Sequence, residues 1–391
     1  MEKFDVDTIR AGLSNALGRF SGCSQKIALY GNYQLLRKTL AREAFCRMES
    51  GGKRIIPDYF IEDESSSSSR QKLINRKLVI PLREAAETCK GCLILICGEH
   101  TRIDDANCRH SFQRLKDMRI EGAEIFTFWG YYYCLHAQEI MEVFDLLHDD
   151  FSKATYAHMI LLRMALVEPD FQYVQEDEYF CLPEFLSINL DEVFVDCGAY
   201  VGDTIETYLD RKMGLFQKIY AFEPMQGQYK ALSARVDRLK KEWGLPDIKF
   251  ELLNAGVGDR NYQIDKEFED IQLEKNVDLS AMTLSFGTEV EQGGIPVFSI
   301  DEFFGEQNVS LIKADIEGFE LKMISGAEYV IKRDKPKLAI CIYHLPIDMF
   351  CIPLRIKKLC PNYTLAIRQH GLGVTETVLY AYVENKLLVI N

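Results

Sequence analysis

The stretch that decides the fold is Val193-Phe-Val-Asp-Cys-Gly-Ala-Tyr-Val-Gly-Asp-Thr204. Its first residues, up to Asp196, form an apolar run that ends in an acid, which predicts a buried strand. Gly198 and Gly202 follow, and two glycines at this spacing permit a tight turn and a close approach of the backbone to a ligand. In an open α/β sheet the ligand lies outside the carboxyl ends of the strands, so we interpret this turn as a binding site.

A second acid lies at the end of the next predicted strand, Lys218–Glu223. Glu223 comes about 20 residues after the glycine turn, where an acid can accept both hydroxyls of a ribose; a solvated carboxylate at a strand end is the alternative. Asp196 adds another carboxylate, and the sequence from Asp196 to Glu206 contains no lysine or arginine that could bind a pyrophosphate. This acid-rich turn therefore favours a ligand with a ribose, a cationic centre and an amino group, such as S-adenosylmethionine, over a dinucleotide.

Around these motifs, strands alternate with helices to the end of the chain. Strands are predicted at 193–196, 218–223, 248–253, 309–313, 337–343, 363–368 and 377–383, and helices at 203–212, 226–242, 319–332 and 347–359. Short extended pieces are expected between residues 260 and 300. Such alternation predicts a doubly wound parallel sheet, and the two adjacent strands at the end predict an antiparallel hairpin at its edge.

The first part of the chain alternates in the same way, which predicts a second, smaller α/β domain with a parallel sheet. Its strands are expected at 26–31, 55–61, 93–97 and 124–128, with a helix at 33–48 and a solvated loop at Ser65–Ser69. Gly31–Arg37 occupies the place of a dinucleotide turn, but the later glycines are missing, and Tyr33 and Leu35 would crowd a pyrophosphate. The acids Glu62–Glu64 still occupy the ribose position. We interpret this domain as a degenerate Rossmann-like unit kept for packing, dimerisation or acceptor recognition, with nucleotide binding as the alternative.

Residues 131–166 contain no glycine or proline and carry apolar residues at helical spacing, which predicts a helical connector. The pattern breaks at Pro169 and Pro183. The predicted organisation is therefore a degenerate Rossmann-like domain at 1–130, a helical connector at 131–184 and the second α/β domain at 185–391. The aromatic cluster Trp129–Tyr133 is interpreted as packing between domains, and a platform that stacks on a sugar is the alternative.

Composition limits the partners and the compartment. The formal net charge is −13 at pH 7, and an acidic surface repels phosphate backbones, which argues against nucleic-acid binding. No apolar run approaches the ~18 residues of a membrane span, and the first ten residues lack the apolar core of a signal peptide. The 12 cysteines are scattered, often in apolar strands, which is typical of reduced thiols in a cytoplasmic protein. Cys89 and Cys92 form a C-x-x-C, but Cys108 and His110 are spaced too closely for the usual second ligand pair of zinc.

Four motifs, in this order and spacing, resemble the FkbM family of S-adenosylmethionine-dependent methyltransferases. They are Val193–Thr204, Tyr220–Pro224, Leu311–Glu320 with the following Ser325-Gly-Ala, and Lys335–His344. The resemblance covers about residues 185–385, and bacterial members with an N-terminal extension of this kind look similar over residues 140–385. It implies a class I methyltransferase fold with a seven-stranded Rossmann-like sheet, and methyl transfer that usually goes to a hydroxyl of a sugar, a polyketide or another metabolite.

The resemblance also implies roles for single residues. The pocket for the methionine part of the cofactor would be formed by Asp196, Gly198, Ala199, Tyr200, Gly202, Asp203 and Thr204. The ribose would be held by Glu223 with Pro224 beside it, the adenine would lie beside Asn254 and Ala255, and the pocket would be closed by Asp315. Cys197 and Tyr200 depart from the family, which often has a small residue and an Asn or Asp there. Tyr200 could narrow the pocket or stack on the ligand.

Methylation of a hydroxyl also needs a general base within hydrogen-bond reach of the acceptor. His344 follows a predicted strand and is a candidate, because a neutral imidazole can take a proton near pH 7; a structural histidine is the alternative. Asp315 and Glu317 could bind the acceptor, act as the base, or stabilise the start of a helix. They could also ligate Mg²⁺ or Ca²⁺, but no third acid occupies a matching position, so we expect no metal.

Three functions remain open at this point. The first is an enzyme that methylates a hydroxyl on a saccharide or a related small metabolite. The second is a catalytically silent protein with a methyltransferase fold that binds S-adenosylmethionine or serves as a scaffold. The third is a nicotinamide-dependent oxidoreductase that uses the first domain, which the incomplete turn at Gly31–Arg37 disfavours. We expect a cytoplasmic protein with a small-molecule or saccharide acceptor and no nucleic-acid partner, and we allow for a homodimer.

Overall fold

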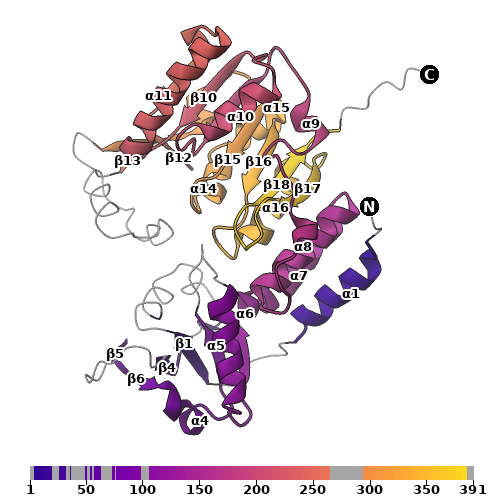
Figure 1. Cartoon of the computed structure of the whole chain (residues 1–391), viewed down its shortest axis with the longest axis vertical. Coiled ribbons are helices and arrows are strands. Elements are labelled where there is room, and N and C mark those ends of the chain that lie inside the picture. The colour runs from indigo at the N-terminus through magenta and orange to yellow at the C-terminus, as the bar shows by residue number, and fades with distance from the viewer. Residues whose placement is uncertain are drawn as a thin grey trace.

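The computed structural model describes residues 4–19, 26–31, 36, 49–50, 53–54, 57–62, 73–74, 76–97, 105–264 and 294–384. It has a mixed α/β fold with two mainly parallel sheets, which confirms the predicted α/β class. The sheets lie at opposite ends of the long axis, with a layer of helices between them (Figure 1). The expected helix at 33–48, apart from Leu36, and the loop at Ser65–Ser69 lie largely outside the described residues.

The larger sheet, as far as the described residues form it, has seven strands in the order β11-β10-β9-β15-β16-β18-β17. They are β9 Val193–Cys197, β10 Lys218–Phe222, β11 Phe250–Leu253, β15 Leu311–Ala314, β16 Lys337–Cys341, β17 Thr364–Gln369 and β18 Thr377–Tyr382. The first five run parallel, whereas β18 is antiparallel to both β16 and β17. Strands β9, β15 and β18 are buried along their whole length, because helices cover both faces of the sheet.

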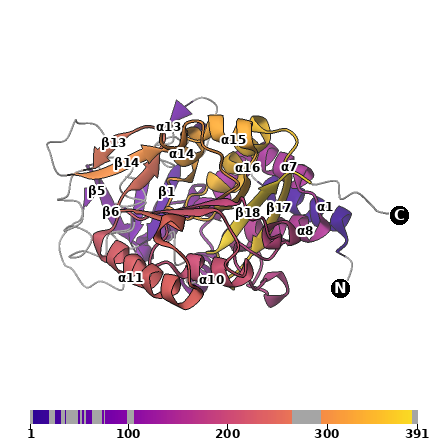
Figure 2. The ribbon, with the colours of Figure 1, turned by 90° about the horizontal axis from the view of Figure 1, so that it is seen from above.

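The helices of this sheet form its two outer layers. One face is covered by α10 Asp203–Arg211 and α11 Gln226–Trp243, and the other by α13 Ile300–Phe304, α14 Glu320–Ser325, α15 Glu328–Asp334 and α16 Asp348–Leu359 (Figure 2). The single helix expected at 319–332 is wrong, since the chain breaks into α14 and α15 at Gly326. The carbonyl of Gly326 accepts from the backbone N–H of Asp301 and the hydroxyl of Ser299, and a Cβ there would lie 2.1 Å from the carbonyl oxygen of Gly258.

The order of the strands in the larger sheet determines where a binding site can form. Strand β9 lies between β10 and β15, and the chain passes from the carboxyl ends of β9 and β15 to helices on opposite faces of the sheet, α10 and α14. At such a switch point the loops at the carboxyl ends diverge and leave a crevice. A three-stranded sheet, in the order β12-β14-β13, stands beside this edge. Its strands are β12 Gly256–Gly258, β13 Tyr262–Ile264 and β14 Ile295–Ser299, which accounts for the extended pieces expected between 260 and 300.

Within the described part of the chain, the smaller sheet has six strands in the order β5-β6-β4-β1-β7-β8. They are β1 Ile27–Gly31, β4 Tyr59–Glu62, β5 Leu73–Ile74, β6 Lys77–Pro81, β7 Leu93–Ile96 and β8 Glu124–Thr127, flanked by α4 Ala85–Thr88 and α5 Asp105–Asp117. All pairs are parallel except β5 with β6, and β5 and β6 are strands that the pattern does not predict. A separate two-stranded ladder joins β2 Glu49–Ser50 to β3 Lys53–Arg54.

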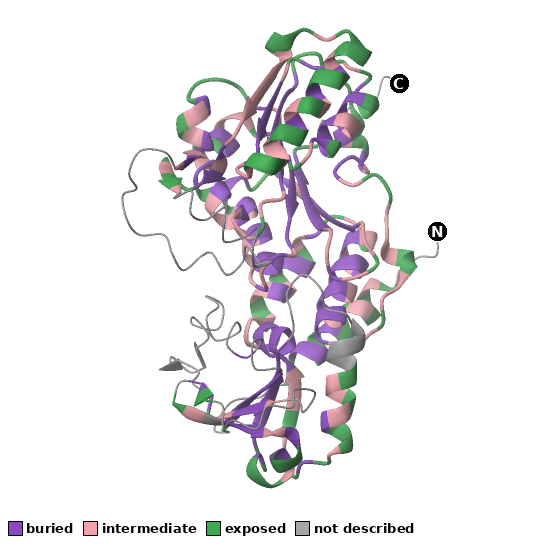
Figure 3. Ribbon diagram, turned by 60° about the vertical axis from the view of Figure 1, so that its left-hand side comes forward, coloured by how far each residue is buried: buried purple, intermediate pink, exposed green. Residues whose placement is uncertain are grey.

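Among the described elements, four helices fill the space between the sheets: α1 Val6–Leu17, α6 Phe128–Leu135, α7 Ala137–Leu146 and α8 Asp150–Arg163. The predicted connector is thus helical, but it consists of three helices, and α1 was not expected. One continuous hydrophobic cluster joins this layer to both sheets, with members such as Leu95, Tyr131, Phe144 and Leu365. Figure 3 shows both sheets and the inner helix faces as buried. The domain limits at 130 and 184 stay predictions.

The helical layer is fastened to the outer strand β17. Leu147 forms a parallel bridge with Leu365, and the backbone N–H of His148 donates to the carbonyl of Leu365 at 2.9 Å. The hydroxyl of Ser152, itself fully buried, accepts from the backbone N–H of Ile367 at 3.0 Å. The aromatic residues Trp129, Tyr131 and Tyr133 are buried in the core cluster, so they serve packing and offer no exposed face for a sugar.

Candidate functional site

A cavity of about 540 Å³ opens at the carboxyl edge of β9, β10 and β15. The predicted site residues that line it are Gly198, Tyr200, Asp203, Thr204, Glu223, Pro224, Ala255, Asp315 and Glu317. The apolar side chains of Val257, Ile295 and Val297 from the small sheet complete one wall. Residues far apart in the sequence therefore meet at one edge, as the rule for open α/β sheets predicts.

The glycine turn is held against both neighbouring strands. The backbone N–H groups of Gly198 and Ala199 both donate to the carbonyl of Phe222 at 3.0 Å. Gly198 has a φ of 79°, and a Cβ at this residue would lie 1.9 Å from the carbonyl oxygen of Asp315. Tyr200, with a φ of 46°, is left-handed without being glycine, a conformation that costs energy and is concentrated at functional sites. Its ring is 56% exposed and lies at the rim of the cavity.

Glu223 is a buried carboxylate that both sides of the turn hold in place. One of its oxygens accepts from the backbone N–H of Tyr200 at 2.9 Å, and the other from that of Met225 at 2.8 Å. Burial raises the pKa of Glu223 to about 7, against the two amides, which lower it. Each oxygen retains a lone pair, so the carboxylate can still accept two hydroxyls of a ligand.

Asn254 and Gly202 act behind the wall of the cavity. The side-chain amide of Asn254 donates to the carbonyls of Glu223 and Pro224, each at 2.9 Å, which fixes the turn that carries the carboxylate. Gly202 precedes α10 with a φ of 82°, and α10 begins at Asp203. Neither residue is among those that line the cavity, and the same is true of the buried Ala199. Their contacts support the shape of the site.

Asp196 also lies behind the cavity, in a buried ion pair. Its carboxylate is 3.1 Å from the Nζ of Lys313, and both side chains are almost completely buried. Lys313 donates in addition to the carbonyl of Gly198 at 2.8 Å. Burial lowers the pKa of Lys313, but Asp196 and Asp315 outweigh it and hold the pKa above its ordinary value. The lysine therefore stays charged and ties β9, β15 and the glycine turn together.

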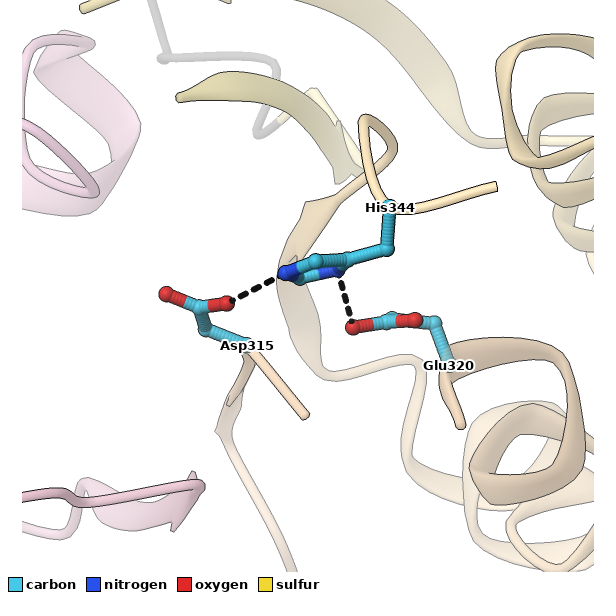
Figure 4. Close-up of side chains that lie close together, drawn as sticks. All are labelled: Asp315, Glu320 and His344. Carbon is cyan, nitrogen blue, oxygen red and sulfur yellow. Dashed lines mark ion pairs between the residues drawn. The ribbon is translucent and has the colours of Figure 1, made fainter. Parts of the chain in front are cut away.

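His344 lies between two carboxylates (Figure 4). Its Nε2 is 3.3 Å from Asp315 and its Nδ1 is 2.9 Å from Glu320, while the ring is 2% exposed. Burial lowers the pKa of His344, but Glu320 and Asp315 raise it well above its ordinary value. An imidazole with a carboxylate at each nitrogen is an imidazolium near pH 7, which has no lone pair to accept a proton. Glu317, 3.7 Å away, adds a third acid.

Asp315 is the member of this group that faces the cavity. It accepts from the hydroxyls of Tyr179 at 3.2 Å and Tyr343 at 3.3 Å, besides its contact with His344. Burial raises the pKa of Asp315, but the hydrogen bond and charge of His344 outweigh it and hold the pKa well below its usual range. Asp315, Glu320 and His344 are near enough to hold a metal ion. Both ring nitrogens already face carboxylates, however, so an ion would first have to displace one of these contacts.

The residues of the site that the sequence analysis missed include Glu178, Tyr179 and Glu320. Glu320 begins α14 and lies in a quoted motif, but nothing in its spacing shows that it reaches His344. Glu178 and Tyr179 line the cavity from the segment before β9, where the pattern shows only a break in helical periodicity. No pattern in this segment could have placed either residue at the carboxyl edge of the sheet.

The structure also bears on the expectations about the cysteines and about a membrane span. The described cysteines are free, and Cys89 and Cys92 are buried neighbours of β7. The side chain of Cys108 lies outside the described part of the chain, so the zinc alternative is not tested. Among the described helices, none combines the length and the apolar composition that crossing a membrane requires.

Comparison with known proteins gives one family. Residues 196–371 match the family model described as the methyltransferase FkbM domain. The crystal structure of methyltransferase FkbM from Methylobacillus flagellatus KT aligns with 97% of this chain and 99% of its own, at 18% identity and a TM-score of 0.56. At this identity the likeness shows a shared fold, and it extends over both sheets.

Two further structures align over part of the chain. An rRNA methylase from Streptococcus thermophilus covers 54% of this chain and 100% of its own, at 16% identity and a TM-score of 0.33. A Streptococcus mutans protein, solved in complex with SAH, covers 49% and 90%, at 13% identity and a TM-score of 0.28. These scores are too low to support an argument. No curated protein matches the chain.

Proposed function

Residues 196–371 form a methyltransferase FkbM domain, and from this premise we propose that the chain transfers a methyl group from S-adenosylmethionine to a hydroxyl of a saccharide or a related small metabolite. The observation that carries the proposal is Glu223. A buried carboxylate that two backbone amides aim into the cavity, beyond a glycine turn, is the arrangement that recognises a ribose. A class I methyltransferase fold is proposed for the seven-stranded sheet on the same grounds.

The residues present fit the cofactor. Gly198, where a Cβ would collide with Asp315, lets the backbone approach a ligand closely, and the turn to Thr204 would hold the methionine part. Glu223 would accept from the ribose hydroxyls. Ala255, next to the apolar wall from the small sheet, would lie beside the adenine. When bound, S-adenosylmethionine supplies an activated methyl group on a sulfonium that leaves as a neutral thioether.

The work left to the chain is positioning and proton transfer. Aligning the acceptor with the methyl carbon and excluding water can supply much of the reduction of the barrier. The acceptor hydroxyl must also lose its proton, and Glu317, which lines the cavity, is the proposed proton acceptor. Asp315, whose pKa is held well below its usual range, is a weak base and would instead bind the acceptor hydroxyl. His344 was the first candidate from the sequence, but as an imidazolium it serves better as the counter-ion that orients Asp315.

The chemical class of the proposed acceptor is inferred from the charge of the cavity wall. The described wall of the cavity carries the carboxylates of Asp203, Glu223, Asp315 and Glu317, whereas the charge of Lys313 is neutralised by Asp196. Such a surface repels anions, which supports a neutral polyhydroxyl acceptor over a phosphorylated one or a nucleic acid. Free buried thiols support a reducing compartment such as the cytoplasm. A homodimer stays a prediction.

Methyl transfer itself separates the enzyme from a silent scaffold. The full chain would be incubated with S-adenosylmethionine labelled in its methyl group and a panel of neutral mono- and oligosaccharides, at pH 7 to 8. We expect label in a saccharide product whose methyl group resists alkali, as an ether does. Binding of the cofactor without transfer to any acceptor would favour the silent alternative. Binding of NAD in its place would favour an oxidoreductase.

Glu223→Ala is expected to weaken the binding of S-adenosylmethionine and of S-adenosylhomocysteine alike, by about 1.5–3 kcal/mol, because a charged acceptor of hydrogen bonds is lost. That corresponds to a dissociation constant roughly 10- to 150-fold higher, measured by titration calorimetry. Glu223→Gln keeps one acceptor oxygen and should lie between the wild type and the alanine variant. Glu242→Ala, an exposed acid on α11, is the control and should leave both affinities unchanged. Unchanged affinity in Glu223→Ala would contradict the proposed ribose contact.

A further inference from the structure

Glu178 reaches the cavity from outside the FkbM domain. It belongs to residues 170–182, here named the strap, which cross the edge of the sheet before β9. Both of its neighbours have left-handed backbones without being glycine, with φ of 60° at Asp177 and 66° at Tyr179. Two such residues around one side chain cost energy and persist only where the surroundings enforce them, and such strain is concentrated at functional sites.

The surroundings do hold the strap in place. The backbone N–H of Gln175 donates to the carbonyl of Gln369 at 2.8 Å, and the backbone N–H of Tyr179 donates to the hydroxyl of Tyr380 at 2.9 Å. Asp177 forms an ion pair with Arg211 of α10. These contacts fasten the strap to β17, β18 and α10 on both sides of Glu178. The position of its carboxylate at the cavity is therefore fixed by the fold.

The charge around Glu178 is negative. It lines the same cavity as Asp315 and Glu317, and the nearby Lys313 is already paired with Asp196. Within the described part of the chain, Glu178 takes part in no ion pair. Burial, together with the charges of Asp315 and Glu376, raises the pKa of Glu178 to about 7, against smaller effects of Tyr179 and Lys313. The other groups that face it are Cys341, Tyr343 and Tyr380.

A carboxylate in this position lacks a cation, and the proposed cofactor carries one. We propose that Glu178 is a specificity residue that recognises the positive charge of the sulfonium, so that the cavity binds S-adenosylmethionine in preference to S-adenosylhomocysteine. The two molecules share the adenine, the ribose and the amino acid, and differ in one methyl group and its charge. The inference rests on the proposed function, because it assigns a further contact to the same site.

The preference for S-adenosylmethionine over S-adenosylhomocysteine should depend on pH. Only the ionised form of Glu178 attracts the sulfonium, so the preference grows as the pH rises through about 7. Glu223 has a pKa raised to the same range, but its contact with the ribose is common to both ligands and cancels in the ratio of affinities. Asp315 has its pKa well below this range, and the carboxylates around His344 hold its pKa well above its ordinary value, so both groups favour their charged forms.

The test is calorimetric titration of the full chain with S-adenosylmethionine and with S-adenosylhomocysteine at pH 6 and pH 8. In the wild type the ratio of the two affinities should rise on the order of fivefold between these values, if the bound cation lowers the pKa of Glu178 by about one unit. In Glu178→Gln the ratio should be independent of pH and about tenfold smaller at pH 8. Its affinity for S-adenosylhomocysteine should stay within about twofold of the wild type at pH 6, where most of Glu178 is neutral.

Glu176→Gln is the matched control, since Glu176 is an exposed acid of the same strap. It should keep the wild-type ratio and its dependence on pH. A constant ratio in the wild type, or a pH-dependent ratio that survives in Glu178→Gln, overturns the inference while the proposed function stands. The wild-type titration provides this test even if Glu178→Gln does not fold. Absence of binding for both ligands in the wild type overturns the proposed function together with the inference.

Discussion

Lys313→Met is expected to lower the free energy of unfolding by about 3–5 kcal/mol, because it leaves the carboxylate of Asp196 buried without a cation. The two groups are 3.1 Å apart and almost fully buried, and Lys313 also donates to the carbonyl of Gly198. Without the lysine, Asp196 must bind a proton to remain buried, so its pKa in the folded state rises. The deficit in stability should therefore be smallest below about pH 4 and grow as the pH increases.

Chemical denaturation of the variant and of two controls measures this effect. Lys332→Met removes an exposed lysine that pairs with Glu328 at 3.2 Å, and it should change the stability by no more than about 0.5 kcal/mol. The double variant Asp196→Asn with Lys313→Met removes both charges of this pair and should recover part of the loss. A loss below 1 kcal/mol in Lys313→Met would mean that the pair is not buried in solution.

Gly198→Ala should lower the free energy of unfolding by roughly 3–5 kcal/mol, as Lys313→Met does, and should abolish binding of the cofactor. The added Cβ would lie 1.9 Å from the carbonyl oxygen of Asp315, a backbone atom that cannot rotate away. The turn or the end of β15 has to move, and either movement displaces a wall of the cavity. The φ of 79° adds strain for any residue other than glycine.

Gly244→Ala is the control that separates the effect of a positive φ from the effect of a steric clash. Gly244 ends α11 with a φ of 64°, and nothing lies within 4 Å of the position of its Cβ. Alanine there should cost only about 1 kcal/mol and leave cofactor binding unchanged. Thermal unfolding of both variants measures the loss of stability, and calorimetric titration measures their binding of the cofactor. Equal effects of the two substitutions would show that the close approach of Gly198 to Asp315 does not matter.

The fold could be predicted where local pattern and tertiary structure agree. Strands β9, β10, β15 and β16 are short apolar runs because they are covered on both faces, and such runs are visible in a sequence. The break at Gly326 could not be predicted, since it depends on a carbonyl that approaches from Gly258. Strand β5 has only two residues and carries no such run, whereas β6 was missed although it contains the apolar run Leu78–Ile80.

The residues of the site likewise include some that could be predicted from the sequence and some that could not. Gly198, Glu223 and Asp315 could be placed because each ends a predicted strand or follows one within two residues, and the carboxyl ends of parallel strands meet at one edge. The protonation state of His344 could not, because it is set by its distances to Asp315 and Glu320 across two elements. Glu178 could not be placed either, because its position depends on contacts of the strap with β17 and β18.

The central claim is that the cavity beside Glu223 binds S-adenosylmethionine. The most direct test is calorimetric titration of the full wild-type chain with S-adenosylmethionine, with NAD titrated in parallel. We predict one site per chain with a micromolar dissociation constant, about −8 kcal/mol, and no binding of NAD. No binding of S-adenosylmethionine, or binding of NAD in its place, would contradict the claim.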